Sequence, residues 1–136
     1  MSETRPGGRL PVTVIGGYLG TGKTTLVNRL LRAADGRKLA VLVNDFGATP
    51  IDRDLIVSSD GDTLEISGGC ICCSYGSDLM DVLMALPEWQ PDIERVVIET
   101  SGVALPGMVA SAVTLLLPYR IDGIVVMVDV ETVRKM

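Results

Sequence analysis

The sequence predicts an α/β protein with a three-layer α/β/α fold, in which helices cover both faces of a mostly parallel sheet. Hydrophobic residues make up 47% of the 136 residues but aromatic residues only 4%, so the core must be built from aliphatic side chains. Short Val/Ile runs alternate with amphipathic segments, which is typical of parallel strands joined by right-handed helical crossovers. The length suits one domain.

The first half of the chain begins this pattern. Residues 1–9 are polar and are expected to form a flexible tail, which leaves residues 10–136 for the domain. Residues 10–15 are an apolar run that ends in glycines, which predicts a buried strand. Apolar side chains recur at helical spacing over residues 23–34, which predicts an amphipathic helix, and the run at residues 38–44 predicts the second strand.

The second half continues the alternation. Residues 56–59 and 63–66 flank an Asp-Gly-Asp turn, which predicts a hairpin. Residues 77–86 carry leucines and a valine on one helical face. Two Val/Ile strands and an intervening helix that starts with proline complete the pattern, at residues 95–99, 106–117 and 123–128.

The composition argues against two classes of protein. The formal net charge is −5, whereas a nucleic-acid binder needs a basic face. No apolar run reaches the roughly 18 residues of a membrane helix, and glycines interrupt the stretch that follows Arg5 and Arg9. We therefore expect a cytoplasmic protein that binds neither nucleic acid nor membrane. The sequence has no histidine, so a metal site must use Cys, Asp or Glu.

Residues 17–24, GYLGTGKT, predict a nucleotide phosphate site. They match G-x-x-x-x-G-K-[ST] at every fixed position, between a predicted strand and a predicted helix. Glycines let backbone N–H groups face an anion, and the helix N-terminus adds positive potential. The alternative is a chance glycine-rich turn. The predicted nucleotide-binding residues are Gly17, Gly20, Thr21, Gly22, Lys23, Thr24 and Thr25.

Three side chains in this segment have specific expected roles. Lys23 should contact the β- and γ-phosphates, the Thr24 hydroxyl should bind Mg²⁺, and Thr25 should reach the α-phosphate. Because Lys23 should face the ligand and not the core, its replacement by alanine is expected to leave the fold largely intact.

The three cysteines, Cys70, Cys72 and Cys73, lie within four residues, which is not a disulfide framework. Adjacent strand residues point to opposite faces, so three thiolates converge only in an irregular loop, and Gly68 and Gly69 permit one. Zn²⁺ favours thiolates, and Cu(I) also accepts three sulfurs. Packing of buried cysteines and a redox pair are the alternatives. We predict a zinc site with an open fourth position.

Several segments together resemble one family. They are GGYLGTGKTT at residues 16–25, NDFG at residues 44–47, GCICC at residues 69–73, Asp78-Leu79, and ETSG at residues 99–102. In this order and spacing the chain resembles the CobW/HypB/UreG family of P-loop GTPases, and within it the CobW-like metallochaperone branch. The resemblance runs from about residue 12 to residue 128.

The resemblance implies GTP hydrolysis coupled to delivery of a metal, Zn²⁺ or Co²⁺, to a client protein. It implies that Asp45 holds Mg²⁺ or the attacking water, that Glu99 bonds a Mg²⁺-bound water, and that the Gly102 N–H senses the γ-phosphate. Lys23, Asp45 and Glu99 are then the expected catalytic residues, and Thr24, Asp45 and Glu99 the expected Mg²⁺ site. From the residues alone, Asp45 is also explained as a turn residue and Glu99 as a strand-end carboxylate.

The chain departs from the family pattern in three places. Asp45 stands where Glu is usual, Leu105 stands where Asp is usual, and the guanine-reading N-K-x-D motif is not found before Met136. We interpret the sequence as the front part of a nucleotide-binding domain that binds GTP and ATP with similar, weak affinity. An open sheet edge should favour a homo-oligomer. The alternatives are a remnant without turnover and a P-loop ATPase or kinase with structural zinc.

Overall fold

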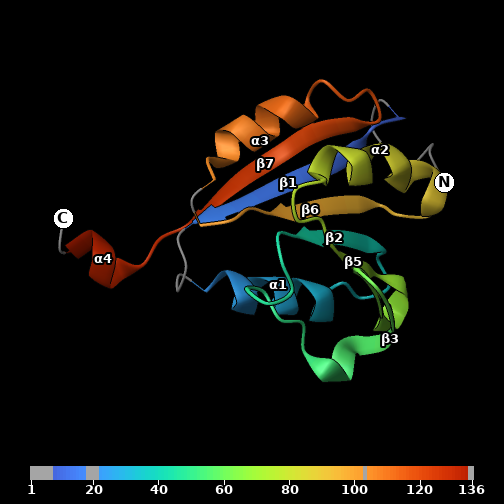
Figure 1. Ribbon diagram of the computed structural model, residues 1–136, viewed down its shortest axis with the longest axis horizontal. Helices are drawn as coiled ribbons and strands as arrows, with labels where there is room; N and C mark the ends of the chain where they lie inside the picture. The colour runs from blue at the N-terminus through green and yellow to red at the C-terminus, as the bar shows by residue number, and fades with distance from the viewer. Residues whose placement is uncertain (1–7, 18–21, 103, 135–136) are drawn as a thin grey trace.

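The computed structural model describes residues 8–17, 22–102 and 104–134. At its centre lies a seven-stranded sheet with the order β3-β4-β5-β2-β6-β1-β7 (Figure 1). The strands are β1 Leu10–Gly17, β2 Leu39–Val43, β3 Ile56–Asp60, β4 Thr63–Ile66, β5 Ile71–Ser74, β6 Arg95–Glu99 and β7 Tyr119–Met127. The helices are α1 Lys23–Arg32, α2 Leu79–Trp89, α3 Pro106–Val113 and α4 Val130–Arg134, with single 3₁₀ turns at Arg53–Leu55 and Ser67–Gly69.

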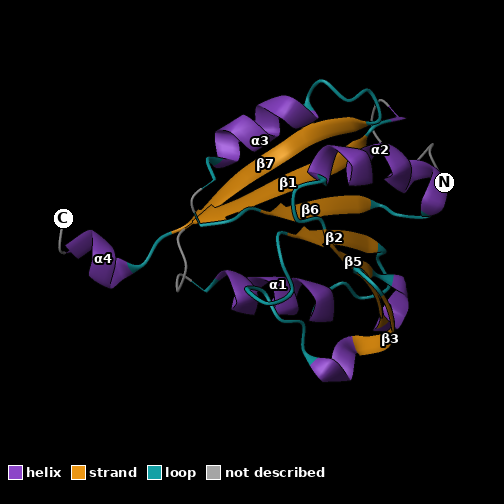
Figure 2. Ribbon diagram, in the orientation of Figure 1, coloured by secondary structure: helices purple, strands orange, loops and turns teal. Residues whose placement is uncertain are grey.

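The sheet is parallel from β5 to β7, whereas the β3–β4 and β4–β5 pairs are antiparallel. Helix α1 covers one face, while α2 and α3 cover the other (Figure 2). The predicted three-layer α/β/α class with a mostly parallel sheet is confirmed.

Each face of the sheet has its own hydrophobic core. Along β1, Val14 belongs to the core under α2 and α3, and the next residue, Ile15, belongs to the core under α1. Because the central strands are buried on both faces, they are continuous aliphatic runs and do not alternate with polar residues. This is why the β1, β2 and β6 runs were readable from the sequence.

The structure corrects the expected elements in four places. Residues 71–74 form β5 where an irregular loop was expected, because they pair with β2 on one side and β4 on the other. Helix α2 runs from Leu79 to Trp89 where residues 77–86 were expected. Helix α3 ends at Val113, four residues before the expected end, and β7 begins at Tyr119, well before residue 123. The chain leaves α3 before Pro118, whose carbonyl then accepts the Leu10 N–H at the start of the β1–β7 pairing.

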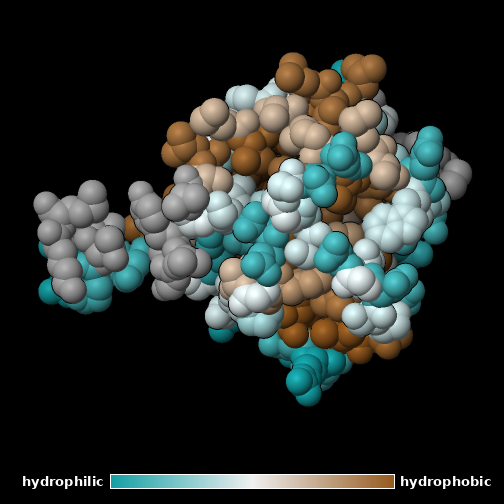
Figure 3. Space-filling view, in the orientation of Figure 1, coloured by the Kyte–Doolittle hydropathy of each residue, from teal (hydrophilic) through white to brown (hydrophobic). Residues whose placement is uncertain are grey.

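Exposed apolar side chains gather over α3 and the turn that follows it, at the top of the molecule in Figure 3, and others lie on β7. They include Met108, Leu115, Leu117, Ile124 and Val126. Strand β7 ends the sheet, so its outer edge has no partner strand within the described ranges. No helix in the described part of the chain is both long and apolar enough to cross a membrane.

Candidate functional site

The site begins where β1 ends and α1 starts. Gly17 is the last residue of β1, and Gly22 caps α1 with a φ of 93°, a left-handed conformation that glycine adopts without steric cost. The first turn of α1 has no acidic residue and its cap makes no side-chain hydrogen bond, so its N–H groups are free of side-chain caps. Such a helix start suits an anion. Gly20 and Thr21, also predicted to bind nucleotide, lie outside the described residues.

Lys23, the first residue of α1, is buried rather than exposed to solvent. Its Nζ lies 3.2 Å from Glu99 Oε2 and donates to the carbonyl of Thr100 at 2.8 Å. The Lys23 side chain is 7% exposed and that of Glu99 is 3% exposed. The lysine predicted to contact phosphate therefore neutralises a buried carboxylate at the end of β6 in this conformation.

Glu99 is the centre of the site. Besides Lys23, its carboxylate accepts the Asn44 N–H at 3.2 Å and the Thr49 hydroxyl at 3.1 Å, both through Oε1. Its backbone carbonyl accepts the Tyr75 hydroxyl at 2.8 Å. One residue thus contacts the start of α1, the segment after β2 and the segment after β5. These meet at the carboxyl ends of parallel strands, where ligands bind in open α/β sheets.

The segment that follows β2 forms a turn that is held by hydrogen bonds within the segment. Asp45 is exposed, its Oδ1 accepts the Gly47 N–H at 2.7 Å, and its carbonyl accepts the N–H groups of Ala48 and Thr49. The Thr24 hydroxyl donates to the Ala48 carbonyl at 3.3 Å, so this segment lies against the expected Mg²⁺ ligand. In this conformation Asp45 acts as a turn residue, and its role toward Mg²⁺ stays a prediction.

Two more predicted nucleotide-binding residues lie nearby. Thr25 is exposed on the first turn of α1, and Gly102 lies in the turn that follows β6. The structure therefore brings Lys23, Thr24 and Glu99 to one edge of the sheet, with Gly102 following Glu99 in the chain.

Sequence reasoning missed the polar side chains that hold this edge together. Asn28 donates to the carbonyls of Thr24 and Pro50 and accepts the Asp52 N–H, which ties α1 to the segment after β2. The Thr49 and Tyr75 hydroxyls donate to Glu99, as does the backbone N–H of Asn44. None belongs to a phosphate or metal motif. The Asn-Asp-Phe-Gly segment was the one available signal, and it pointed to Asp45 instead of its neighbour.

Asp52, in the segment after β2, pairs with a cation of α1. Its carboxylate and that of Asp54 accept hydrogen bonds from the guanidinium of Arg32, each at 2.8 Å. These bonds raise the pKa of Arg32 above its usual range, and the bond from Arg32 lowers the pKa of Asp54. All three side chains are solvent-exposed, so the pairs contribute little to stability.

The cysteines do not converge in this conformation. Cys70 and Cys72 are buried in the core under α1, and Cys73 is buried in the core under α2 and α3. Cys72 and Cys73 are successive residues of β5, so their side chains point to opposite faces. The expectation of an irregular loop that gathers all three sulfurs is therefore wrong for this state. Within the described residues no cluster of three or more His, Cys, Asp or Glu side chains is placed to hold a metal.

Burial also keeps Cys72 and Cys73 in the neutral thiol form. Burial raises the pKa of Cys72, and the nearby Cys73 and Glu99 raise it further. Burial likewise raises the pKa of Cys73, although the Thr63 hydroxyl opposes this shift. Cys70 Sγ lies 3.3 Å from the carbonyl of Arg37 and accepts the Leu39 N–H at 3.4 Å. A metal binds thiolates, so the burial of Cys72 and Cys73 in this conformation disfavours the form of these two residues that would bind it.

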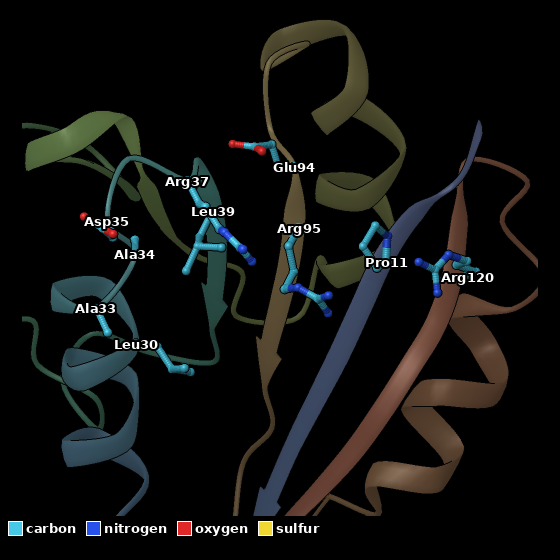
Figure 4. A pocket seen from close by; sticks show the side chains of 10 residues that line it. All are labelled: Pro11, Leu30, Ala33, Ala34, Asp35, Arg37, Leu39, Glu94, Arg95 and Arg120. Carbon is cyan, nitrogen blue, oxygen red and sulfur yellow. The ribbon is translucent and has the colours of Figure 1, made fainter. Parts of the chain in front are cut away.

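A pocket of about 640 Å³ lies at the opposite end of the sheet (Figure 4). It is lined by apolar residues of α1, β1 and β2 and by Arg37, Arg95 and Arg120. Arg95 and Arg120 both contact Asp122 of β7. None of the residues predicted for nucleotide or metal lines this pocket, so it does not form part of the site.

Known proteins resemble the chain over nearly its whole length. The zinc chaperone CobW of Sinorhizobium sp is 35% identical over 131 residues, which are 90% of this chain and 37% of that protein. The zinc chaperone YjiA of Escherichia coli is 36% identical over 128 residues, which are 88% of this chain and 40% of that protein. Zinc-regulated GTPase metalloprotein activator 1 of Dictyostelium discoideum is 35% identical over 85% of this chain and 26% of its own length.

Solved structures give the same result. The Zn(II)-bound YjiA GTPase of E. coli superposes with a TM-score of 0.66 and 33% identity, over 93% of this chain and 42% of that one. A Zn(II)-bound YjiA variant, with one glutamate and two cysteines replaced by alanine, gives the same TM-score. The chain thus spans less than half the length of these relatives. The sequence model of the CobW/HypB/UreG nucleotide-binding domain matches residues 11–136. The chain therefore belongs to the CobW/HypB/UreG family of nucleotide-binding domains, as its motifs predicted.

Proposed function

We propose that this chain is a GTP-dependent carrier of a thiolate-bound metal, with zinc as the cargo. Family membership supports nucleotide binding, and the relatives named as zinc chaperones or as a zinc-regulated GTPase support the metal. In this proposal the three cysteines bind the cargo, and nucleotide state determines when they are available to receive it or pass it to a client protein.

The observation that carries the proposal is the buried pair of Lys23 and Glu99 beside the start of α1. An ammonium group placed there can contact a phosphate at the helix N-terminus. A bound triphosphate would compete with Glu99 for Lys23, since both are anions. Phosphate binding would therefore free the carboxylate in the same step.

The residues around this pair fit Mg²⁺. The Thr24 hydroxyl and the Glu99 carboxylate are hard oxygen donors, and Mg²⁺ takes few protein ligands while keeping waters and phosphate oxygens. Bound Mg²⁺ would supply positive charge against the phosphates. Asp45 would have to leave its own turn to take part, so we propose it for the active state only. The Gly102 N–H is proposed to sense the γ-phosphate.

Nucleotide titration tests the first half of the proposal. Fluorescent GTP and ATP analogues are titrated with Mg²⁺ into the wild type, Lys23→Met and Lys38→Met. Lys38 is the matched control, because its Nζ pairs with Asp92 at 3.8 Å on the surface. We expect Lys23→Met to weaken binding at least about tenfold, the loss of one charge-assisted contact, and Lys38→Met to have little effect.

If the wild type and Lys23→Met bind the nucleotide analogues with equal affinity, and circular dichroism shows both proteins to be folded, the assignment of Lys23 to phosphate is contradicted. A hundredfold preference for ATP would favour the ATPase alternative.

Metal competition tests the second half. The chain is titrated with Zn²⁺ against a chromophoric chelator, with and without GTP and Mg²⁺. We expect about one Zn²⁺ per chain with proton release, tighter binding with nucleotide, and at least about tenfold weakening in Cys72→Ser. Unchanged zinc affinity in Cys72→Ser would contradict the proposal that the cysteine thiolates bind the metal.

The structural-zinc alternative is less well supported. A structural metal is part of the folded core, yet here the cysteines pack as apolar groups in two separate cores. A remnant that binds without turnover would pass both binding tests and fail a phosphate-release assay with GTP and Mg²⁺, so that assay separates it from an active GTPase.

A further inference from the structure

Strand β5, here called the cysteine strand because it carries Cys72 and Cys73, has to separate from its neighbours before the cysteine sulfurs can converge. On β5, Cys72 pairs with Val41 of β2 and with Leu64 of β4, and Cys73 pairs with Leu42 and Thr63. As long as both ladders are intact, the two side chains stay on opposite faces. A site that uses all three sulfurs therefore requires unpairing of β5, at least at its carboxyl end.

What holds that end in place is a set of contacts in the three residues that follow Cys73. The Ser74 hydroxyl and the Gly76 N–H donate to the carbonyl of Asn44, and the Tyr75 N–H donates to the carbonyl of Val43. These contacts anchor the strand end to its neighbour β2. The Tyr75 hydroxyl reaches further, because it donates at 2.8 Å to the carbonyl of Glu99, at the end of β6. In the sheet order, β2 lies between β5 and β6.

The Glu99 carbonyl belongs to a peptide group that the nucleotide site also holds. The Thr100 N–H and hydroxyl both donate to the carbonyl of Ile15, and Lys23 Nζ donates to the carbonyl of Thr100. Lys23 also pairs with the Glu99 carboxylate. Capture of Lys23 by a phosphate would remove two of the contacts that fix this strand end, directly beside the acceptor of the Tyr75 hydroxyl.

We infer that Tyr75 is a positioning residue whose hydroxyl latches the cysteine strand to the nucleotide site, and that nucleotide binding opens β5 by releasing this latch. The inference rests on the proposed function and adds the residue that connects its two halves. Tyr75 carries no cargo and touches no phosphate in this scheme. It keeps β5 in the sheet until Glu99 moves.

The structure supplies a matched control. Tyr119 is likewise buried in the core under α2 and α3, and its hydroxyl donates to a backbone carbonyl, that of Leu83. Tyr75→Phe and Tyr119→Phe each remove one hydroxyl and keep the ring. A purely structural role predicts similar effects of the two variants on cysteine exposure, since both lower the stability of one core.

The experiment follows alkylation of the three cysteines by iodoacetamide in the full chain, with mass spectrometry to locate each label. Wild type, Tyr75→Phe and Tyr119→Phe are compared without nucleotide and with GTP and Mg²⁺. Without nucleotide we expect Tyr75→Phe to label Cys72 and Cys73 about fivefold faster than wild type, the change that loss of one typical hydrogen bond produces. Tyr119→Phe should differ from wild type by less than about twofold.

Adding GTP and Mg²⁺ should accelerate labelling in the wild type and in Tyr119→Phe, and should have a smaller effect in Tyr75→Phe, whose latch is already absent. Equal acceleration in both Phe variants without nucleotide would mean that labelling follows overall unfolding, which overturns the latch. Wild-type rates in Tyr75→Phe would overturn it as well. If GTP does not bind, the proposed function fails, but the comparison without nucleotide still tests the hold of Tyr75 on β5.

Discussion

Lys23 and Glu99 form a buried ion pair, with Nζ and Oε2 3.2 Å apart, between the start of α1 and the end of β6. The two residues are far apart in the sequence, and each was predicted to face the ligand. Their pairing means that the charges of these two side chains already balance each other before any nucleotide binds. It also changes what a substitution of Lys23 should do to the fold.

Our first prediction is that Lys23→Ala destabilises the chain. Removal of the ammonium leaves the Glu99 carboxylate buried without its cation, and breaking one side of such a pair typically costs about 3–5 kcal/mol. The sequence alone suggested a largely intact fold. Urea unfolding measures the difference in the free energy of unfolding.

The double variant Lys23→Met with Glu99→Gln is the control for that prediction. The amide is neutral, so it should recover a large part of the stability lost in Lys23→Met. If the double variant is as unstable as the sum of the two single variants, the pair does not contribute as described.

Our second prediction concerns alkaline pH. Burial raises the pKa of Cys72 and of Cys73 from the ordinary 9.0, and raises that of Tyr75 from 10.0 to about 12. Above pH 9 the unfolded chain therefore loses protons that the folded chain keeps. The free energy of unfolding should be independent of these groups below pH 8 and fall as pH rises above 9, by up to about 1.4 kcal/mol per pH unit for each such group.

Urea unfolding between pH 7 and pH 11 measures this slope. In Cys72→Ala the decline between pH 9 and pH 10 should be shallower, because one buried thiol no longer titrates. The same slope in the variant and the wild type would show that Cys72 is not protected from ionisation in the folded state.

Our third prediction compares two glycines at the junction of β1 and α3. A Cβ on Gly16 would lie 2.0 Å from Pro106 Cγ, whereas a Cβ on Gly107 would meet nothing within 4 Å. Gly16→Ala should therefore force β1 and α3 apart and cost about 1–3 kcal/mol. Gly107→Ala, on the exposed first turn of the helix, should be neutral or stabilise by up to about 1 kcal/mol. Thermal unfolding of both variants checks the pair, and a Gly16→Ala variant as stable as wild type would contradict the close approach.

Our fourth prediction concerns the outer edge of β7. Ile124, Val125 and Val126 are between 41% and 57% exposed on a strand that ends the sheet. An apolar open edge favours pairing with another chain, and a lysine on such an edge opposes it. We expect the purified chain to associate at high concentration and Val126→Lys to shift it toward monomer in light scattering after size exclusion. A wild type that stays monomeric at every concentration would contradict this expectation.

The sequence predicted the fold better than it predicted the site. Buried parallel strands are continuous aliphatic runs, so β1, β2 and β6 were recognisable without their partners. Strand β5 was not, because its four residues, Ile-Cys-Cys-Ser, follow two glycines and Cys70, and such a cysteine pattern suggests a metal-binding loop. Its strand conformation is imposed by ladders with β2 and β4, which no local signal encodes.

The site residues divide in the same way. Lys23, Thr24 and Glu99 were predicted because they belong to recognisable motifs, and their roles toward nucleotide and Mg²⁺ stay predictions. Asn28, Asn44, Thr49 and Tyr75 were missed because they act through hydrogen bonds to segments that are distant in the sequence. Such contacts depend on how the strand ends meet, which follows from the sheet order and not from any pattern of neighbouring residues.

The burial of Cys72 and Cys73 on opposite faces of β5 has a consequence for oxidative damage. Peroxides attack the exposed thiolate, and these sulfurs are neither exposed nor deprotonated. Two sulfurs on opposite sides of a sheet also cannot approach the bond length of a disulfide. In this conformation Cys72 and Cys73 are therefore protected from oxidation without a bound metal or a reducing partner, and in the proposed scheme they become vulnerable only while β5 is unpaired.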